Sequence, residues 1–105
     1  MVAKTFIAQR KLIGIDPGGN RRTIHIQIGL PYEYGPEEWV CPVGLEGLYP
    51  ELSDTHGGDS FQALVLAIRL TRKLLEGYIK KGGVLVDEYE GENVNLEDAF
   101  SSGVF

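Results

Sequence analysis

The strongest constraint on the fold is one amphipathic segment that lies between two glycine pairs, Gly57-Gly58 and Gly82-Gly83. Apolar residues recur in this segment every three or four positions, which is the period of an α-helix. This period places seven residues on a common face: Leu64, Ala67, Ile68, Thr71, Leu74, Leu75 and Tyr78. The pattern predicts a helix from Asp59 to about Lys81 that packs through this face.

Both ends of the predicted helix carry residues that favour helix termini. Asp59 is a favourable N-cap, and Gln62 follows three positions later, which is the spacing of a capping box. Lys80 falls in the last turn, where its positive charge is favourable near the negative end of the helix. Val65 and Leu66 are apolar at positions that point away from the packed face. We therefore interpret Val65 and Leu66 as candidate interface residues.

Most of the remaining chain shows strand patterns. Residues 5–15 are rich in β-branched and apolar side chains, and residues 22–30 alternate between apolar and polar positions. The turn-forming residues 16–20 lie between them and predict a hairpin. Residues 38–45 are a third strand candidate, and residues 84–86 are a fourth.

The resulting order of elements predicts the fold class. Pro42 lacks an amide donor, so the strand at residues 38–45 is expected at a sheet edge or with a bulge. Residues 31–36 are interpreted as a break, and residues 46–58 as a loop that crosses the sheet. A run of strands followed by a helix is typical of an α+β fold. We predict two layers: an antiparallel sheet in the order β-β-β-α-β with one long helix packed on one face.

Length and charge limit the domain organisation and the partners. The 105 residues allow one domain, expected at residues 1–88, followed by an acidic C-terminal tail at residues 89–105. The formal net charge is −5, and residues 31–58 and 83–105 each hold six acidic residues and no Lys or Arg. Because phosphate backbones attract basic surfaces, nucleic acid is not an expected partner.

Several further classes of protein are disfavoured. Cys41 is the single cysteine, so no internal disulfide can form, and His25 and His56 do not have the spacing of a zinc site. We expect no metal and no cofactor. The chain has no apolar run of membrane-spanning length and no signal-peptide pattern, so we expect a cytoplasmic protein that does not enter a membrane.

Four polar residues near the predicted helix start are candidates for ligand binding: His56, Asp59, Ser60 and Gln62. A serine with a nearby histidine is a feature of some hydrolases. However, the nucleophile motif G-x-S-x-G is absent, because Gln62 stands where the second glycine would be. We therefore assign no catalytic residue and keep these four as a candidate polar lining of a small site.

Exposed aromatic residues suggest a protein interface. Tyr32, Tyr34 and Tyr49 lie in predicted irregular segments within an acidic part of the chain. Tyrosine is enriched in protein interfaces, and surface loops often carry binding residues. We interpret these three as candidate interface residues, while Trp39 is expected in the core.

Three short motifs resemble those of a family of small bacterial proteins without an assigned function. The segment Asp59-Ser60-Phe61-Gln62-Ala63-Leu64 resembles a helix start of the form G-x-D-S-F-Q-A-L. Ile28-Gly29-Leu30-Pro31 resembles an I-G-x-P turn, and Trp39-Val40-Cys41-Pro42 resembles a cysteine-containing strand. The resemblance covers roughly residues 10–86. It implies a bacterial domain of unknown function and supplies no activity.

These observations leave two interpretations of function. The first is a protein-interaction or self-associating module, as a homodimer or with a protein partner. It includes an immunity- or inhibitor-like protein, since an acidic face can cover a basic enzyme site. The alternative is a small enzyme or ligand-binding domain with a site at the loop 46–58 and the helix start.

Overall fold

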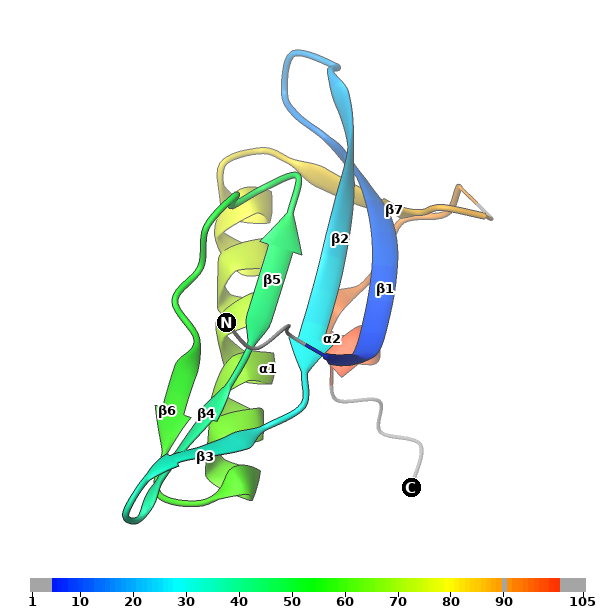
Figure 1. Ribbon diagram of the computed structural model, residues 1–105. Coiled ribbons are helices and arrows are strands. Elements are labelled where there is room, and N and C mark those ends of the chain that lie inside the picture. Colours follow the sequence, from blue (N-terminus) through cyan, green and yellow to red (C-terminus); the bar gives the residue numbers. More distant parts are fainter. Residues whose placement is uncertain (1–4, 90, 101–105) are drawn as a thin grey trace.

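The computed structural model describes residues 5–89 and 91–100, which form two antiparallel sheets and two helices (Figure 1). In chain order the elements are β1 (Phe6–Ile15), β2 (Arg21–Gly29), β3 (Tyr32–Gly35), β4 (Glu38–Cys41), β5 (Val43–Glu46), β6 (Thr55–Gly57), α1 (Ser60–Lys80), β7 (Val84–Asp87) and α2 (Leu96–Phe100). The larger sheet has the order β5-β2-β1-β7, and the smaller sheet has the order β3-β4-β6. The predicted α+β fold, with a long helix packed on an antiparallel sheet, is confirmed.

The β1–β2 hairpin forms the centre of the larger sheet, and its turn is held by Asp16. The backbone carbonyl of Asp16 accepts a hydrogen bond from the Gly19 amide, and its carboxylate accepts one from the Asn20 amide at 2.9 Å. The hydrogen bond from the Asn20 backbone is the main reason that the pKa of Asp16 is lowered. Gly19 has a φ of 87°, which glycine adopts without steric strain.

The second sheet is the main departure from the predicted strand order. The strand predicted at residues 38–45 divides at Pro42 into β4 and β5, which belong to different sheets. Proline cannot donate to a strand ladder, so regular pairing is interrupted at this residue. Gly29 at the end of β2 donates to the Pro42 carbonyl at 2.7 Å, and a Cβ on Gly29 would lie 2.5 Å from the Pro42 ring. Only glycine allows this approach.

Two segments that were predicted to be irregular also contain strands. Strand β3 lies inside the predicted break at residues 31–36, and strand β6 lies at the end of the predicted loop 46–58. The prediction was wrong at these residues because strands of three or four residues are too short to show a clear period. Their pairing is set by neighbouring strands and not by a local pattern.

Helix α1 packs on both sheets and joins two hydrophobic clusters. Its fully buried residues follow one another at intervals of four: Ala63, Ala67, Thr71 and Leu75. The first cluster of core residues surrounds Ala63 and Ala67 and adds Ile28, Cys41 and Val43. The second surrounds Leu75 and adds Leu12, Ile24, Ile26, Leu45, Leu85 and Leu96. The buried face is rotated from the predicted one, and Ile68 is 38% exposed.

The chain returns to the core after β7. Val86 forms a bridge with Asn93, the Val94 amide donates to the Leu85 carbonyl at 2.9 Å, and Leu96 of α2 is buried. Helix α2 lies on the same side of the larger sheet as α1 (Figure 1). The division of the chain at residue 88 stays a prediction, and residues 101–105 of the predicted tail lie outside the described residues. Of the helices described, none has the length and apolar character needed to cross a membrane.

Tyr78, near the end of α1, supplies a test of the packing. Its hydroxyl is buried and has no hydrogen-bond partner among the described residues. We expect Tyr78→Phe to leave the free energy of unfolding unchanged or to raise it by up to about 1 kcal/mol, because an unpaired buried polar group is removed. Urea unfolding measures this difference.

The matched control is Tyr78→Ala, which removes the ring that packs against Gly14 and Gly83. We expect it to lower the free energy of unfolding by about 3 kcal/mol or more, since it leaves a cavity. A clear loss of stability in Tyr78→Phe would contradict the assignment of an unpaired hydroxyl.

Candidate functional site

The smaller sheet presents one face to α1 and the other face away from it. Residues that pair directly across strands share a face, and the pairing aligns Tyr32, Val40 and His56. Alternation along β4 adds Glu38 to this outer face, and Tyr34, which lies at a register shift in β3, joins it through its ring contact with His56. The opposite face, which points toward α1, carries five residues: Glu33, Trp39, Cys41, Thr55 and Gly57.

The outer face brings together residues from all three strands. The Nδ1 atom of His56 donates to the carboxylate of Glu38 at 2.8 Å. The rings of Tyr34 and His56 meet edge to face, with centroids 5.9 Å apart and planes at 76°. The side chains of Tyr32 and Tyr34 are 46% and 62% exposed. We call Tyr32, Tyr34, Glu38 and His56 the aromatic patch.

Gly57 and Thr55 lie on the inner face of the smaller sheet, where β6 comes close to α1. The hydroxyl of Thr55 donates to the Ala63 carbonyl at 2.8 Å, which fixes β6 against α1. A Cβ on Gly57 would lie 2.5 Å from the Ala63 backbone nitrogen, so a larger residue would push the strand from the helix. At Gly58 the nearest atom would be the Gln62 side-chain oxygen at 3.5 Å, an ordinary contact.

The helix start is satisfied by local hydrogen bonds. The Asp59 carboxylate accepts a hydrogen bond from the backbone N–H of Gln62 at 2.7 Å, as the capping box predicts. In a capping box the Gln62 side chain would accept a hydrogen bond from the backbone N–H of Asp59. Here its side-chain oxygen accepts instead from the backbone N–H of Gly58, at 2.6 Å. Ser60 is exposed in the first turn. These bonds give Asp59 and Gln62 a structural role.

The structure groups the predicted site residues differently from the sequence interpretation. His56 contacts Tyr34 and Glu38, whereas Asp59 and Gln62 bond to the backbone at the helix start. No hydrogen bond joins His56 to Asp59, Ser60 or Gln62 among the residues that the structure describes. Ligand binding by these four residues stays a prediction. The sequence carried no signal that the rings of Tyr32 and Tyr34 share a face, because β3 is short and shifts register between Glu33 and Gly35.

The other candidate interface residues lie apart from the patch. Tyr49 follows β5, forms a bridge with Leu45, and is 38% exposed. Val65 is half-buried on α1. Leu66, predicted to point outward, is also half-buried and lines a groove of about 790 Å³ between β6 and α1.

This groove begins at the aromatic patch and continues along α1. We call it the α1 groove and define it by its lining residues: Thr55, His56, Leu66, Arg69, Leu70, Arg72, Lys73 and Glu76. The guanidinium of Arg72 donates to the Glu76 carboxylate at 2.9 Å. The sequence gives no sign of this groove, because β6 has only three residues and lies in a segment that predicts a loop.

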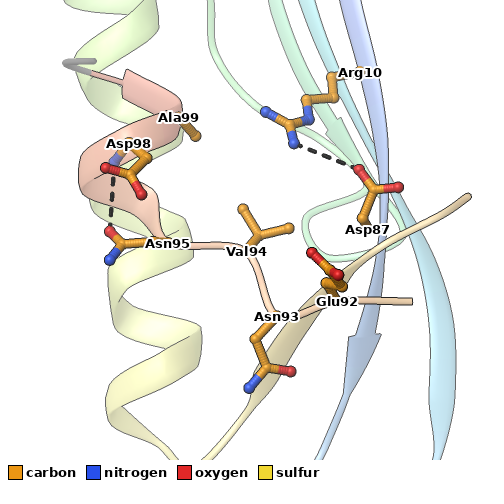
Figure 2. A pocket seen from close by; sticks show the side chains of 8 residues that line it. All are labelled: Arg10, Asp87, Glu92, Asn93, Val94, Asn95, Asp98 and Ala99. Carbon is orange, nitrogen blue, oxygen red and sulfur yellow. Dashed lines mark hydrogen bonds and ion pairs between the residues drawn. The ribbon is translucent and has the colours of Figure 1, made fainter. Parts of the chain in front are cut away.

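A smaller hollow of about 280 Å³ lies between β1, the end of β7 and the segment before α2 (Figure 2). Figure 2 shows Arg10 directed toward Asp87, with 3.8 Å between the charged atoms, and Asn95 on the opposite wall. The Asn95 side chain accepts from the Glu97 amide at 2.8 Å and so caps α2. The Asn95 side chain therefore has a structural role at the start of α2. Within residues 5–89 and 91–100, no three His, Cys, Asp or Glu side chains are grouped to hold a metal ion.

Cys41 is enclosed behind the smaller sheet. It is fully buried, and its thiol lies 3.4 Å from the Gly29 carbonyl. Burial raises the pKa of the Cys41 thiol, and the negative charge of Asp54 raises it further. A neutral, inaccessible thiol is a poor nucleophile, so Cys41 is a core residue.

The chain belongs to a known domain family. Residues 8–96 match the family model described as "Domain of unknown function (DUF6968)". No curated protein and no solved structure gives a significant match. The expectation of an uncharacterised domain family is confirmed. Membership of this family assigns no activity to the chain.

The role of Asp59 can be tested by stability. We expect Asp59→Ala to lower the free energy of unfolding by about 1 kcal/mol, because the backbone N–H of Gln62 loses its acceptor. Asp59→Asn is the control and should retain most of the stability, since asparagine is also a good N-cap. Equal stability of all three proteins in urea unfolding would contradict a capping role.

The reactivity of Cys41 tests its burial. We expect a thiol reagent at mildly alkaline pH to modify Cys41 on the order of 100-fold more slowly in the folded protein than in urea. The raised pKa reduces the thiolate fraction in the folded state, and unfolding restores both the ordinary pKa and access. Ser53→Cys in a Cys41→Ala background is the exposed control. Rapid modification of folded wild-type protein would show that Cys41 is accessible.

Proposed function

We propose that this chain is a protein-binding module and that the aromatic patch is its binding surface. The observation that carries this proposal is the exposure of Tyr32 and Tyr34 on one face of a paired strand. Rings held by a sheet lose little conformational entropy on binding and bury a large amphipathic area. Aromatic residues of this kind are enriched where protein interfaces are most fully desolvated.

The charge around the patch favours a partner with a basic surface. Residues 31–58 hold six acidic residues and no Lys or Arg. Glu33 lies between the two tyrosines in sequence, and Glu38 is itself part of the patch. In a symmetric homodimer through the patch, Glu38 and the acidic stretch around it would be brought close to the same stretch of the second copy, and like charges repel. A different protein with Lys or Arg on its surface would be attracted instead. Inhibition of an enzyme with a basic site is one form of this function.

The double variant Tyr32→Ala/Tyr34→Ala tests the proposal. We expect the wild-type chain to co-purify with a partner protein from its natural source. The double variant should retain at least about tenfold less of this partner, because both rings are lost from the interface. Native mass spectrometry of gently purified, tagged protein measures the complex. The free energy of unfolding should change by less than about 1 kcal/mol, since both side chains are exposed.

Tyr89→Ala is the matched control, because Tyr89 is 91% exposed and lies after β7, outside the patch. It should retain the partner at the wild-type level. Retention of the partner by the double variant would contradict the proposal, as would the absence of any complex. A wild-type homodimer that the double variant disrupts would assign the patch to self-association and not to a basic partner.

A further inference from the structure

The α1 groove combines an apolar floor with a strand edge. Leu66 and Leu70 are half-buried on one side of α1, and Thr55 and His56 of β6 lie across from them. Strand β6 is the outer strand of the smaller sheet and pairs only with β4 among the described strands. An open strand edge can pair with the backbone of an extended peptide, while pockets beside it take alternate side chains.

The rim of the groove is basic, although the chain as a whole is acidic. Arg69 and Lys73 are exposed on successive turns of α1, and neither has an ion-pair partner among residues 5–89 and 91–100. Arg72 is paired with Glu76, so these two charges largely compensate each other. Two uncompensated positive charges therefore border this groove in a chain whose formal net charge is −5.

This combination of features fits one class of ligand. Carboxylates of an acidic segment would meet the guanidinium of Arg69 and the ammonium of Lys73, and exposed basic side chains favour such encounters. An apolar side chain of the same segment would cover Leu66 and Leu70, which are otherwise open to solvent on this side. A basic segment would be repelled by the rim, and a purely apolar one would leave the two positive charges without a counter-charge.

We propose that the α1 groove binds an extended acidic peptide segment that also carries apolar side chains. The segment lies along β6, with its apolar side chains on Leu66 and Leu70 and its carboxylates at Arg69 and Lys73. This site goes beyond the proposed function, because it is a second surface of opposite charge. The aromatic patch and the α1 groove meet at His56 and do not depend on each other.

A designed peptide tests this site. The probe is a short dye-labelled peptide in which Glu alternates with Val, and fluorescence anisotropy with the full chain measures its Kd. We expect a Kd below about 1 mM, a Kd that rises with salt, and no measurable binding of the counterpart in which Lys replaces Glu. A second counterpart with Ser in place of Val should bind at least about threefold more weakly, because it lacks the apolar contacts.

The charge variant Arg69→Glu/Lys73→Glu should weaken binding of the Glu-Val peptide at least about tenfold. The matched control is Lys80→Glu/Lys81→Glu, which makes the same change in net charge at exposed residues beyond the groove. This control should change the Kd by no more than about twofold, because exposed charges at a distance are screened. Amide chemical shifts should change at Thr55, Leu66 and Leu70 on addition of the peptide.

Three results would overturn the inference. They are equal binding of the Lys-Val peptide, equal weakening by the two charge variants, and no binding of the Glu-Val peptide at about 1 mM. Tyr32→Ala/Tyr34→Ala should bind the peptide as the wild type does. Loss of peptide binding in that variant, with chemical shifts at Tyr32 and Tyr34, would place the peptide on the aromatic patch. The inference would then fail while the proposed function stands.

Discussion

The fold depends on the close contact between the first half of α1 and the smaller sheet. Ala63 and Ala67 are small, Gly57 has no side chain, and the Thr55 hydroxyl bonds directly to the helix backbone. Further along the helix, Leu75 fills the wider space under the larger sheet. One helix can therefore cover two sheets, because the side chains on its buried face are small where the strands are near and larger where they are distant.

The junction between the sheets decides which surfaces remain open. Pro42 ends the pairing of β4 and directs the chain into β5, and the close approach of Gly29 fixes this crossing. The smaller sheet therefore stands beside the larger one, at the N-terminal end of α1 (Figure 1). Since α1 covers only its inner face, the rings of Tyr32 and Tyr34 stay exposed on the outer face. The same arrangement leaves the edge of β6 next to the helix, where the α1 groove forms.

The two proposed surfaces differ in charge because they come from different parts of the chain. The patch belongs to an acidic stretch of sequence, and the groove takes its charge from Arg69 and Lys73 on the helix. Their boundary is the hydrogen-bonded pair of His56 and Glu38. The blocks of charge were visible in the sequence, but their position in space depends on β6 pairing with β4. A protein with such neighbouring surfaces can discriminate between partners by charge as well as by shape.

The sequence by itself determined the features that depend on near neighbours. The helix period, the Asp59 cap and the turn of the β1–β2 hairpin all follow from residues a few positions apart. Only the tertiary structure decided that β3 and β6 are strands, that His56 meets Tyr34, and that Leu66 lines a groove. These features arise from pairing and packing between distant segments. A strand of three residues has no period of its own, so its place is set by the strands and the helix that it contacts.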